Sequence, residues 1–290
     1  RRPEAIKHGL GMAGRQKTAR EVAADLVTGV TETRHSITDL IATGMLTALA
    51  PPDRARAQRL AGLTLTHLAR AETVLKRHLR KGPPPFVRAV LDLATVEMLE
   101  TGQDAHGVVD DAVTLVRERG RKTEGFAGLT NAVLRKVAAT DPDDWAALPP
   151  QQLPGWLRGR LMSAYGKAVV VAMEAAHARG APIDLTPKDG DAAALAQRLG
   201  GADLGTGSVR LTGRVQVSEL PGYDSGDWWV QDAAAALAAQ AVRAAPGERV
   251  LDLCAAPGGK TLQLAASGAS VTALDLSAPR MERVRENLAR

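Results

Sequence analysis

The chain has 290 residues, of which 45% are hydrophobic and 24% charged, and its net charge is +5. This composition argues against wholesale disorder. The chain contains no run of about 18 apolar residues, so no transmembrane helix is expected. The single cysteine, Cys254, excludes an intramolecular disulfide and a multi-cysteine zinc site within the chain. We therefore expect a cytoplasmic protein without a membrane partner.

Charge is unevenly distributed along the chain. Residues 1–140 contain 22 Lys and Arg against 15 Asp and Glu, a net charge of +7, whereas residues 141–290 carry −2. A basic half is typical of contact with a polyanion such as nucleic acid, although arginine-rich solvated helix faces would explain it equally well. Aromatic residues make up only 3% of the chain, which argues against a base-stacking platform.

The first half is predicted to be helical after an aperiodic tail over residues 1–17. Thr18 and Glu21 match a capping box, and Val22, Leu26 and Val30 follow on one helix face. No strand-like alternation appears in residues 18–140, so we predict an all-α domain. Its further helices are expected at 36–49, from 51 to at least 75, and at 86–99, 108–119 and 126–139.

Proline-rich segments at 141–144 and 148–150 predict a domain boundary. A helical stretch over 153–179, a strand at 182–185, a helix at 191–199, strand-like alternation over 208–220 and a helix at 232–243 follow. Residues 249–253 and 271–276 then read as strands, with helices at 261–266 and 279–288. Strand, glycine loop, helix, strand and helix in that order are typical of the opening of a doubly wound α/β sheet.

The glycine loop runs over Cys254, Ala255, Ala256, Pro257, Gly258, Gly259 and Lys260. It follows a strand and opens a helix, where backbone N–H groups point at a bound ligand. Asp275 ends the next strand 17 residues after Gly258, and an acid at such a distance commonly accepts hydrogen bonds from ribose hydroxyls. The pattern therefore fits an adenosine-containing cofactor.

Four interpretations of this loop are open from the residues alone. A phosphate-binding P-loop requires glycine at position 254, where this chain has cysteine, and a dinucleotide loop requires the absent G-x-G-x-x-G pattern. A class I methyltransferase loop for S-adenosylmethionine and a glycine turn without a ligand are the other two.

The string from Asp252 to Thr261, DLCAAPGGKT, resembles the cofactor motif of RNA cytosine-C5 methyltransferases. Asp275 and Arg280 match that family's next motif, and Trp229-Val230-Gln231-Asp232 resembles its segment before the cofactor domain. This resemblance implies S-adenosylmethionine as cofactor, held by residues 254–260, Asp275 and Arg280.

The first half is similar to the antitermination factor NusB in residues 108–113, VVDDAV, and 131–135, NAVLR. A NusB-like domain joined to this methyltransferase resembles the RsmB (Fmu/Sun) family, which methylates C5 of a cytosine in small-subunit ribosomal RNA. Residues 153–157 and 164–166 are similar to that family's connecting segment. We therefore expect a tail at 1–17, a NusB-like RNA-binding domain at 18–140, a connecting α/β region at 141–225 and an incomplete methyltransferase domain at 226–290.

The catalytic cysteines that the resemblance implies lie downstream of the cofactor motifs and are absent from these 290 residues. C5 methylation requires a thiolate that adds to C6 of the cytosine, and Cys254 lies in the cofactor loop, where the family's cysteine is not the nucleophile. We therefore expect no catalytic residue in this chain and no activity from it alone. Two strands of such a sheet should also leave apolar faces exposed.

Basic residues near the end of the helical domain are candidates for contacts with RNA phosphates, with a solvated helix face as the alternative. No metal ligand set is expected from the six scattered histidines. The main alternative function is a non-catalytic NusB-like module that binds RNA or protein, and the oligomeric state stays open. The candidate RNA-binding residues are Arg117, Arg119, Arg121, Lys122, Arg135 and Lys136.

Overall fold

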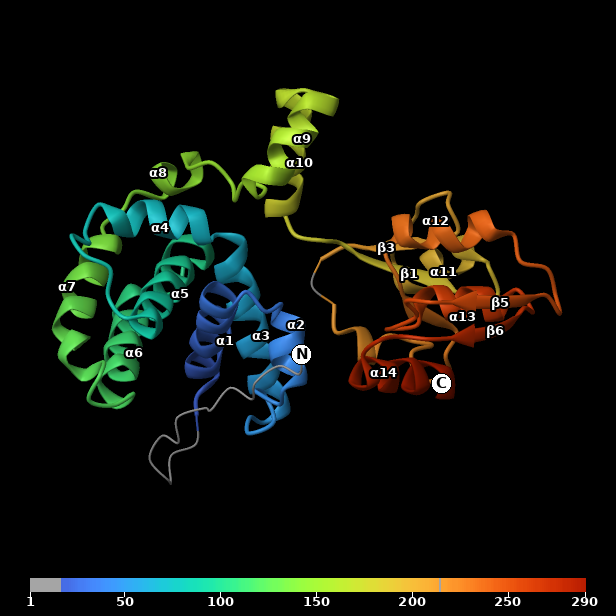
Figure 1. Cartoon of the computed structure of the whole chain (residues 1–290), viewed down its shortest axis with the longest axis horizontal. Coiled ribbons are helices and arrows are strands. Elements are labelled where there is room, and N and C mark those ends of the chain that lie inside the picture. The colour runs from blue at the N-terminus through green and yellow to red at the C-terminus, as the bar shows by residue number, and fades with distance from the viewer. Residues whose placement is uncertain (1–16, 214) are drawn as a thin grey trace. The chain divides into compact units, whose positions relative to one another are not determined.

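The computed structural model describes residues 17–213 and 215–290. Apart from Lys17, the tail predicted over 1–17 lies outside the described residues. Contacts within the chain divide it into two compact units with the boundary between Gly180 and Ala181 (Figure 1). We call them the helical unit and the α/β unit.

The helical unit contains ten α-helices and one short 3-10 helix within residues 17–180, and no strand among them. The predicted all-α character of residues 18–140 is therefore confirmed. Thr18 caps the first helix as predicted, since its side chain accepts a hydrogen bond from the Glu21 N–H. The elements are α1 (Ala19–Thr33), α2 (Ile37–Ala42), α3 (Pro51–Thr66), α4 (Leu68–Lys76), α5 (Pro85–Thr101), α6 (Ala105–Glu118), η1 (Glu124–Phe126), α7 (Ala127–Val137), α8 (Pro142–Ala147), α9 (Gly155–Tyr165) and α10 (Lys167–Ala178).

Helix α5 is the centre of this unit and packs against α1, α3, α4, α6 and α7 (Figure 1). Twelve of its 17 residues are buried, including Val87, Leu91 and Val96, because hydrophobic residues occur around its whole circumference. A single hydrophobic cluster joins it to its neighbours and extends to Trp145 of α8. Burial of this cluster supplies the driving force for folding of the unit.

Several predicted helices are shorter or interrupted. The helix predicted over 36–49 ends at Ala42 and continues as turns, where Gly44 has φ of 89°. The helix predicted from residue 51 to at least 75 breaks at His67, and the stretch predicted over 153–179 divides at Gly166, whose φ is 81°. Such positive φ values stop a helix, since side-chain-bearing residues rarely adopt them. Helix α8 forms where the sequence suggested only a break.

The α/β unit begins with a four-stranded antiparallel sheet of order β2-β3-β1-β4. In the centre of the sheet, Leu185 pairs with Val209 on one side and with Val230 on the other. A cluster of seven buried residues, among them Leu185, Leu195 and Trp228, forms its core. The elements are β1 (Ile183–Pro187), α11 (Ala192–Leu199), β2 (Ala202–Asp203), β3 (Val209–Leu211), η2 (Val217–Glu219), β4 (Trp228–Val230) and α12 (Ala233–Val242).

The prediction of strand-like structure over 208–220 is wrong beyond Leu211. The described residues that follow form turns and the short helix η2, and the sheet instead recruits β4, which was not predicted as a strand. Polar and apolar residues alternate in turns as well as in strands, so periodicity over a short segment did not separate the two.

The second part of the α/β unit is a parallel pair of strands joined through a helix. Strands β5 (Arg249–Asp252) and β6 (Ser270–Ala273) pair in parallel, α13 (Gly259–Ala266) connects them, and α14 (Ala278–Ala289) follows. This arrangement confirms the predicted opening of a doubly wound sheet. Asp252 lies opposite Ala273, so the loops that follow both strands meet at the same edge of the sheet.

Candidate functional site

The candidate cofactor loop spans residues 253–258 between the end of β5 and the start of α13. Its first turn is bonded to the neighbouring strand, since the Leu274 N–H donates to the Asp252 carbonyl at 2.8 Å and the Ala255 N–H donates to the Leu274 carbonyl at 2.9 Å. The Thr261 hydroxyl donates to the Asp252 carboxylate at 2.7 Å. These bonds fix both ends of the loop at the carboxyl edge of the strands.

Asp275 connects the end of β6 to the middle of this loop. One of its carboxylate oxygens accepts the Ser277 N–H at 2.9 Å, and the other accepts the Ala256 N–H at 3.1 Å. These donors, Ser277 first, and the nearby Arg280 charge outweigh desolvation and lower the pKa of Asp275. The carboxylate is therefore ionised at neutral pH and retains lone pairs for further donors.

Helix α14 holds the loop from its other side. Arg280 donates from Nη2 to the Ala256 carbonyl at 2.7 Å, and Asn287 donates from Nδ2 to the Pro257 carbonyl at 3.1 Å. Arg280 was selected by its motif alone, and in the structure its side chain binds the backbone of the loop. Asn287 gave no signal in the sequence, because its role depends on where α14 packs.

The two glycines of the loop meet different requirements. Gly258 has φ of 110°, which favours glycine, and it precedes the first residue of α13. A Cβ atom on Gly259 would lie 3.2 Å from Cγ of Gln231, which is buried beneath it. Glycine therefore permits the turn at one position and a close approach at the other.

Gln231 links the segment before the cofactor domain to the loop. Its Oε1 accepts the Trp229 indole N–H at 2.8 Å, and its Nε2 donates to Oε1 of Gln263 on α13 at 2.9 Å. The sequence singled out this segment only by its resemblance to a family motif, and no spacing argument placed Gln231 under the glycines. Its partner Gln263 was missed for the same reason.

The remaining predicted loop residues divide into buried and exposed ones. Ala255 and Ala256 are buried, whereas Cys254 and Lys260 are exposed. Within the described residues, no side chain caps the N-terminus of α13 and no acid occurs in its first turn. The backbone N–H donors of this uncapped helix start can bind a negatively charged ligand group such as a carboxylate. The ionised Asp275 beside them can accept hydrogen bonds from ligand hydroxyls.

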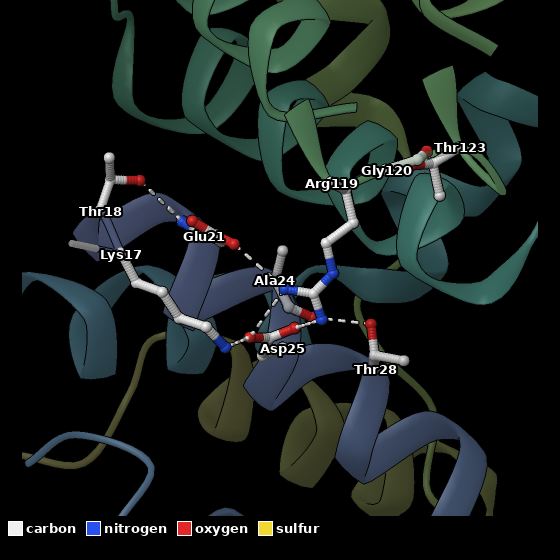
Figure 2. Close-up of polar contacts among 9 residues, drawn as sticks. All are labelled: Lys17, Thr18, Glu21, Ala24, Asp25, Thr28, Arg119, Gly120 and Thr123. Carbon is white, nitrogen blue, oxygen red and sulfur yellow. Dashed lines mark hydrogen bonds and ion pairs between the residues drawn. The ribbon is translucent and has the colours of Figure 1, made fainter. Parts of the chain in front are cut away.

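The candidate RNA-binding residues do not share one environment. Arg119 donates to Glu21 at 3.1 Å and to Asp25 at 2.5 Å (Figure 2). Its guanidinium lies 4.3 Å from the centre of the Phe86 ring. Lys17 pairs with the same Asp25 at 2.8 Å. Arg119 thus joins the end of α6 to α1, and two carboxylates compensate its charge.

The other five candidates are exposed on α6, on the turn after it and on α7. Arg135 donates to the side chain of Asn131 at 3.2 Å on its own helix. These five positions remain predictions as contacts for RNA. They are Arg117, Arg121, Lys122, Arg135 and Lys136.

Residues 17–213 and 215–290 contain no group of three or more His, Cys, Asp and Glu side chains that could hold a metal ion. No helix in this part of the chain has the length and apolar character needed to cross a bilayer.

Comparison with protein families identifies two regions. Residues 17–139 match the NusB family, and residues 239–290 match the family described as 16S rRNA methyltransferase RsmB/F. The second match contains the whole candidate loop together with Asp275 and Arg280.

Curated relatives match nearly the whole chain. Ribosomal RNA small subunit methyltransferase B of Xanthomonas campestris pv. campestris is 30% identical over 97% of this chain, and that of Pseudomonas putida is 32% identical over 82%. The chain covers 65% and 58% of their respective lengths, so it spans less than two thirds of either protein.

A solved structure, that of PH0851, shares the fold over 95% of this chain with a TM-score of 0.65 and 17% identity. The chain covers 67% of that structure. At this identity the likeness supports the fold alone.

Proposed function

The chain belongs to the RsmB family of ribosomal RNA small-subunit methyltransferases, and from this premise we propose that it takes part in S-adenosylmethionine-dependent methylation of C5 of a cytosine in 16S ribosomal RNA. The observation that carries the proposal is the bonding of Asp275 to Ala256 of the glycine loop at the shared edge of β5 and β6. Ribosomal RNA is cytoplasmic in bacteria, and we propose the same location for this protein.

The residues present fit the cofactor. Asp275 would accept the ribose hydroxyls of S-adenosylmethionine, because its carboxylate is ionised and both oxygens keep free lone pairs. The backbone from Cys254 to Lys260 would surround the rest of the molecule, and Arg280 would keep Ala256 in place. When bound, the cofactor supplies an electrophilic methyl group.

The cysteine nucleophile that the family resemblance implies is not among these 290 residues. Cys254 is exposed on the loop that would approach the cofactor, and the family's cysteine at this position is not the nucleophile. We therefore assign residues 1–290 to RNA and cofactor binding and expect this polypeptide alone to be inactive.

The helical unit would bind the RNA substrate. The exposed candidates on α6 and α7 are available for phosphate contacts, whereas Arg119 is held by Glu21 and Asp25. A non-catalytic NusB-like module would also use this unit, but it would have no need of a cofactor loop. Cofactor binding therefore separates the two functions.

Calorimetric titration of residues 1–290 with S-adenosylhomocysteine tests the cofactor assignment. We expect a complex for the wild-type chain and about tenfold or greater weakening in Asp275→Asn, because a charged hydrogen-bond acceptor is lost. Asp224→Asn is the matched control, since Asp224 is exposed in the same unit and forms no hydrogen bond or ion pair within the described residues.

Each measurement has an outcome that contradicts the proposal. Absence of binding by a folded wild-type chain would favour the non-catalytic module. Equal affinities of Asp275→Asn and Asp224→Asn for S-adenosylhomocysteine would show that Asp275 does not contribute to the cofactor site. Methyl transfer to undermethylated 16S ribosomal RNA by residues 1–290 alone would overturn the expected inactivity.

A further inference from the structure

A second basic region, separate from the predicted one, surrounds a cleft at the junction of α4 and α5. The cleft has a volume of about 390 Å³. Four of its lining side chains are cationic, Lys76, Arg80, Lys81 and Arg88, and Glu72 is the one acid among them. The lining therefore carries a net charge of +3.

Three of the four cations are uncompensated by the protein. Lys76, Arg80 and Lys81 are exposed, and none forms an ion pair or side-chain hydrogen bond within residues 17–213 and 215–290. Arg119, in contrast, has two carboxylate partners. Uncompensated cations around one concave surface concentrate the positive potential and attract anions from solution.

The fourth cation, Arg88, is held in position. Its Nε donates to the buried Asp92 at 3.1 Å, and its Nη2 lies 3.7 Å from the Glu72 carboxylate. These contacts restrict the guanidinium on the first turn of α5, so less side-chain entropy is lost when it binds an anion.

The start of α5 adds a second feature that favours an anion. The helix begins at Pro85, two residues after the cleft-lining residue Pro83. Within the described residues, no side chain caps this end and no acid stands in its first turn. The partial positive charge of a 17-residue helix therefore lies beside the cleft without an internal counter-charge.

The composition of the surface favours nucleic acid over protein. None of the exposed large hydrophobic side chains of the described residues lies between His67 and Asp104, whereas protein interfaces are organised around buried apolar anchors. No aromatic side chain lines the cleft on which a base could stack. The chemistry that remains is charge pairing with backbone phosphates.

We propose that the cleft between α4 and α5 binds backbone phosphates of the RNA substrate. The inference rests on the proposed function and assigns part of its RNA contact to residues that sequence reasoning did not select. Since phosphates are common to all sequences, this contact would strengthen binding without selecting the modified cytosine.

The test compares two variants of residues 1–290 that lose the same charge. Arg80→Ala/Lys81→Ala removes two cations from the cleft, and Arg56→Ala/Arg59→Ala removes two exposed cations of α3 without a described partner. Affinity for a short single-stranded RNA is measured over a range of salt concentrations, with a polyaspartate peptide as competitor. Circular dichroism checks that each variant folds, and Lys76→Gln serves as a second cleft variant.

We expect the cleft double variant to bind RNA about tenfold or more weakly at low salt, with its log–log salt slope reduced by about 1.4, since two phosphate contacts are lost. The α3 control should change affinity by about twofold or less. Lys76→Gln should reduce the salt slope by about half as much as the double variant.

Equal losses of RNA affinity in the cleft and control variants would overturn the proposal, because they would show that binding depends only on the net charge of the protein. An unchanged affinity of the cleft variants would also overturn it, as would polyaspartate competition as strong as that of RNA, which would indicate an acidic protein partner. No RNA binding by the wild-type chain would contradict the RNA substrate itself, whereas cofactor binding would still be measured separately.

Discussion

The helical unit and the α/β unit are stabilised by different kinds of interaction. In the helical unit, one continuous hydrophobic cluster joins helices from α1 to α8. In the α/β unit, the cluster contains seven buried residues, and none comes from β5 or β6. Leu251 and Leu253 are 55% and 65% exposed, so the glycine loop owes its geometry mainly to hydrogen bonds.

Two carboxylates show the same contrast. Asp92 is buried in α5, where desolvation outweighs the Arg88 guanidinium and raises its pKa to about 7. One of its oxygens, Oδ1, has no hydrogen-bond partner. Asp275 has a backbone donor on each oxygen and a lowered pKa. A densely packed core therefore destabilises a charge that a polar loop stabilises.

The largest effect is expected from Asp92→Asn. Because the folded-state pKa of Asp92 is raised from about 4 to about 7, its contribution to stability is present below pH 4 and is lost as the pH rises through 7. Between pH values below 4 and pH values above 7, the contribution of Asp92 to the free energy of unfolding changes by about 4 kcal/mol. Urea unfolding of wild type and variant between pH 4 and pH 8 should show a gain in the variant's relative stability as the pH rises.

Asp275 provides the comparison with the opposite sign. Its lowered pKa contributes stability above the unfolded pKa near 4, and this is lost as the pH falls. Asp275→Asn should therefore lose relative stability as the pH rises from acid to neutral. A parallel pH dependence of the two variants would show that the environments of Asp92 and Asp275 do not differ as described.

A matched pair of leucine truncations compares packing in the two units. Leu91 is fully buried in α5, so Leu91→Ala should cost about 3 kcal/mol of unfolding free energy through lost contacts and a cavity. Leu251→Ala should cost less than about 0.5 kcal/mol, because more than half of the side chain is already in water. Native-state amide hydrogen exchange can report each unit separately. Similar costs would contradict the contrast in packing.

Two glycine substitutions of opposite sign should have smaller effects than Leu91→Ala. Gly258→Ala should destabilise the α/β unit by about 1–2 kcal/mol, because φ of 110° strains any residue with a Cβ. Gly159→Ala should stabilise the helical unit by about 0.5–1 kcal/mol, since Gly159 lies within α9 and a Cβ there meets nothing within 4 Å. Thermal unfolding measures both, and a stabilising Gly258→Ala would show that the loop does not require glycine.

Secondary structure was most predictable where one signal dominated. The cap at Thr18, the helices α5 and α6, and the glycine loop between strand and helix are present as expected. Errors occurred where the local pattern was ambiguous. The residues after Leu211 alternate like a strand without pairing as one, and β4 was missed because its pairing with β1 is a long-range property.

The motif residues of the candidate site could be predicted from the sequence, whereas the residues that hold them in place could not. The spacing from Gly258 to Asp275 places both at one sheet edge, since parallel strands end on the same side. Gln231, Gln263 and Asn287 contribute bonds that depend on how separate elements pack. No local pattern encodes such contacts.

The sequence by itself predicted the helical and α/β halves, the glycine loop and the family resemblance, because periodicity, turn residues and motifs are local properties. Only the tertiary structure decided which charges are available to a ligand. It paired Arg119 with Glu21 and Asp25, and it gathered Lys76, Arg80, Lys81 and Arg88 around one cleft. Charge counted along a chain is fixed by composition, whereas its compensation depends on which residues folding brings within a few ångströms of each other.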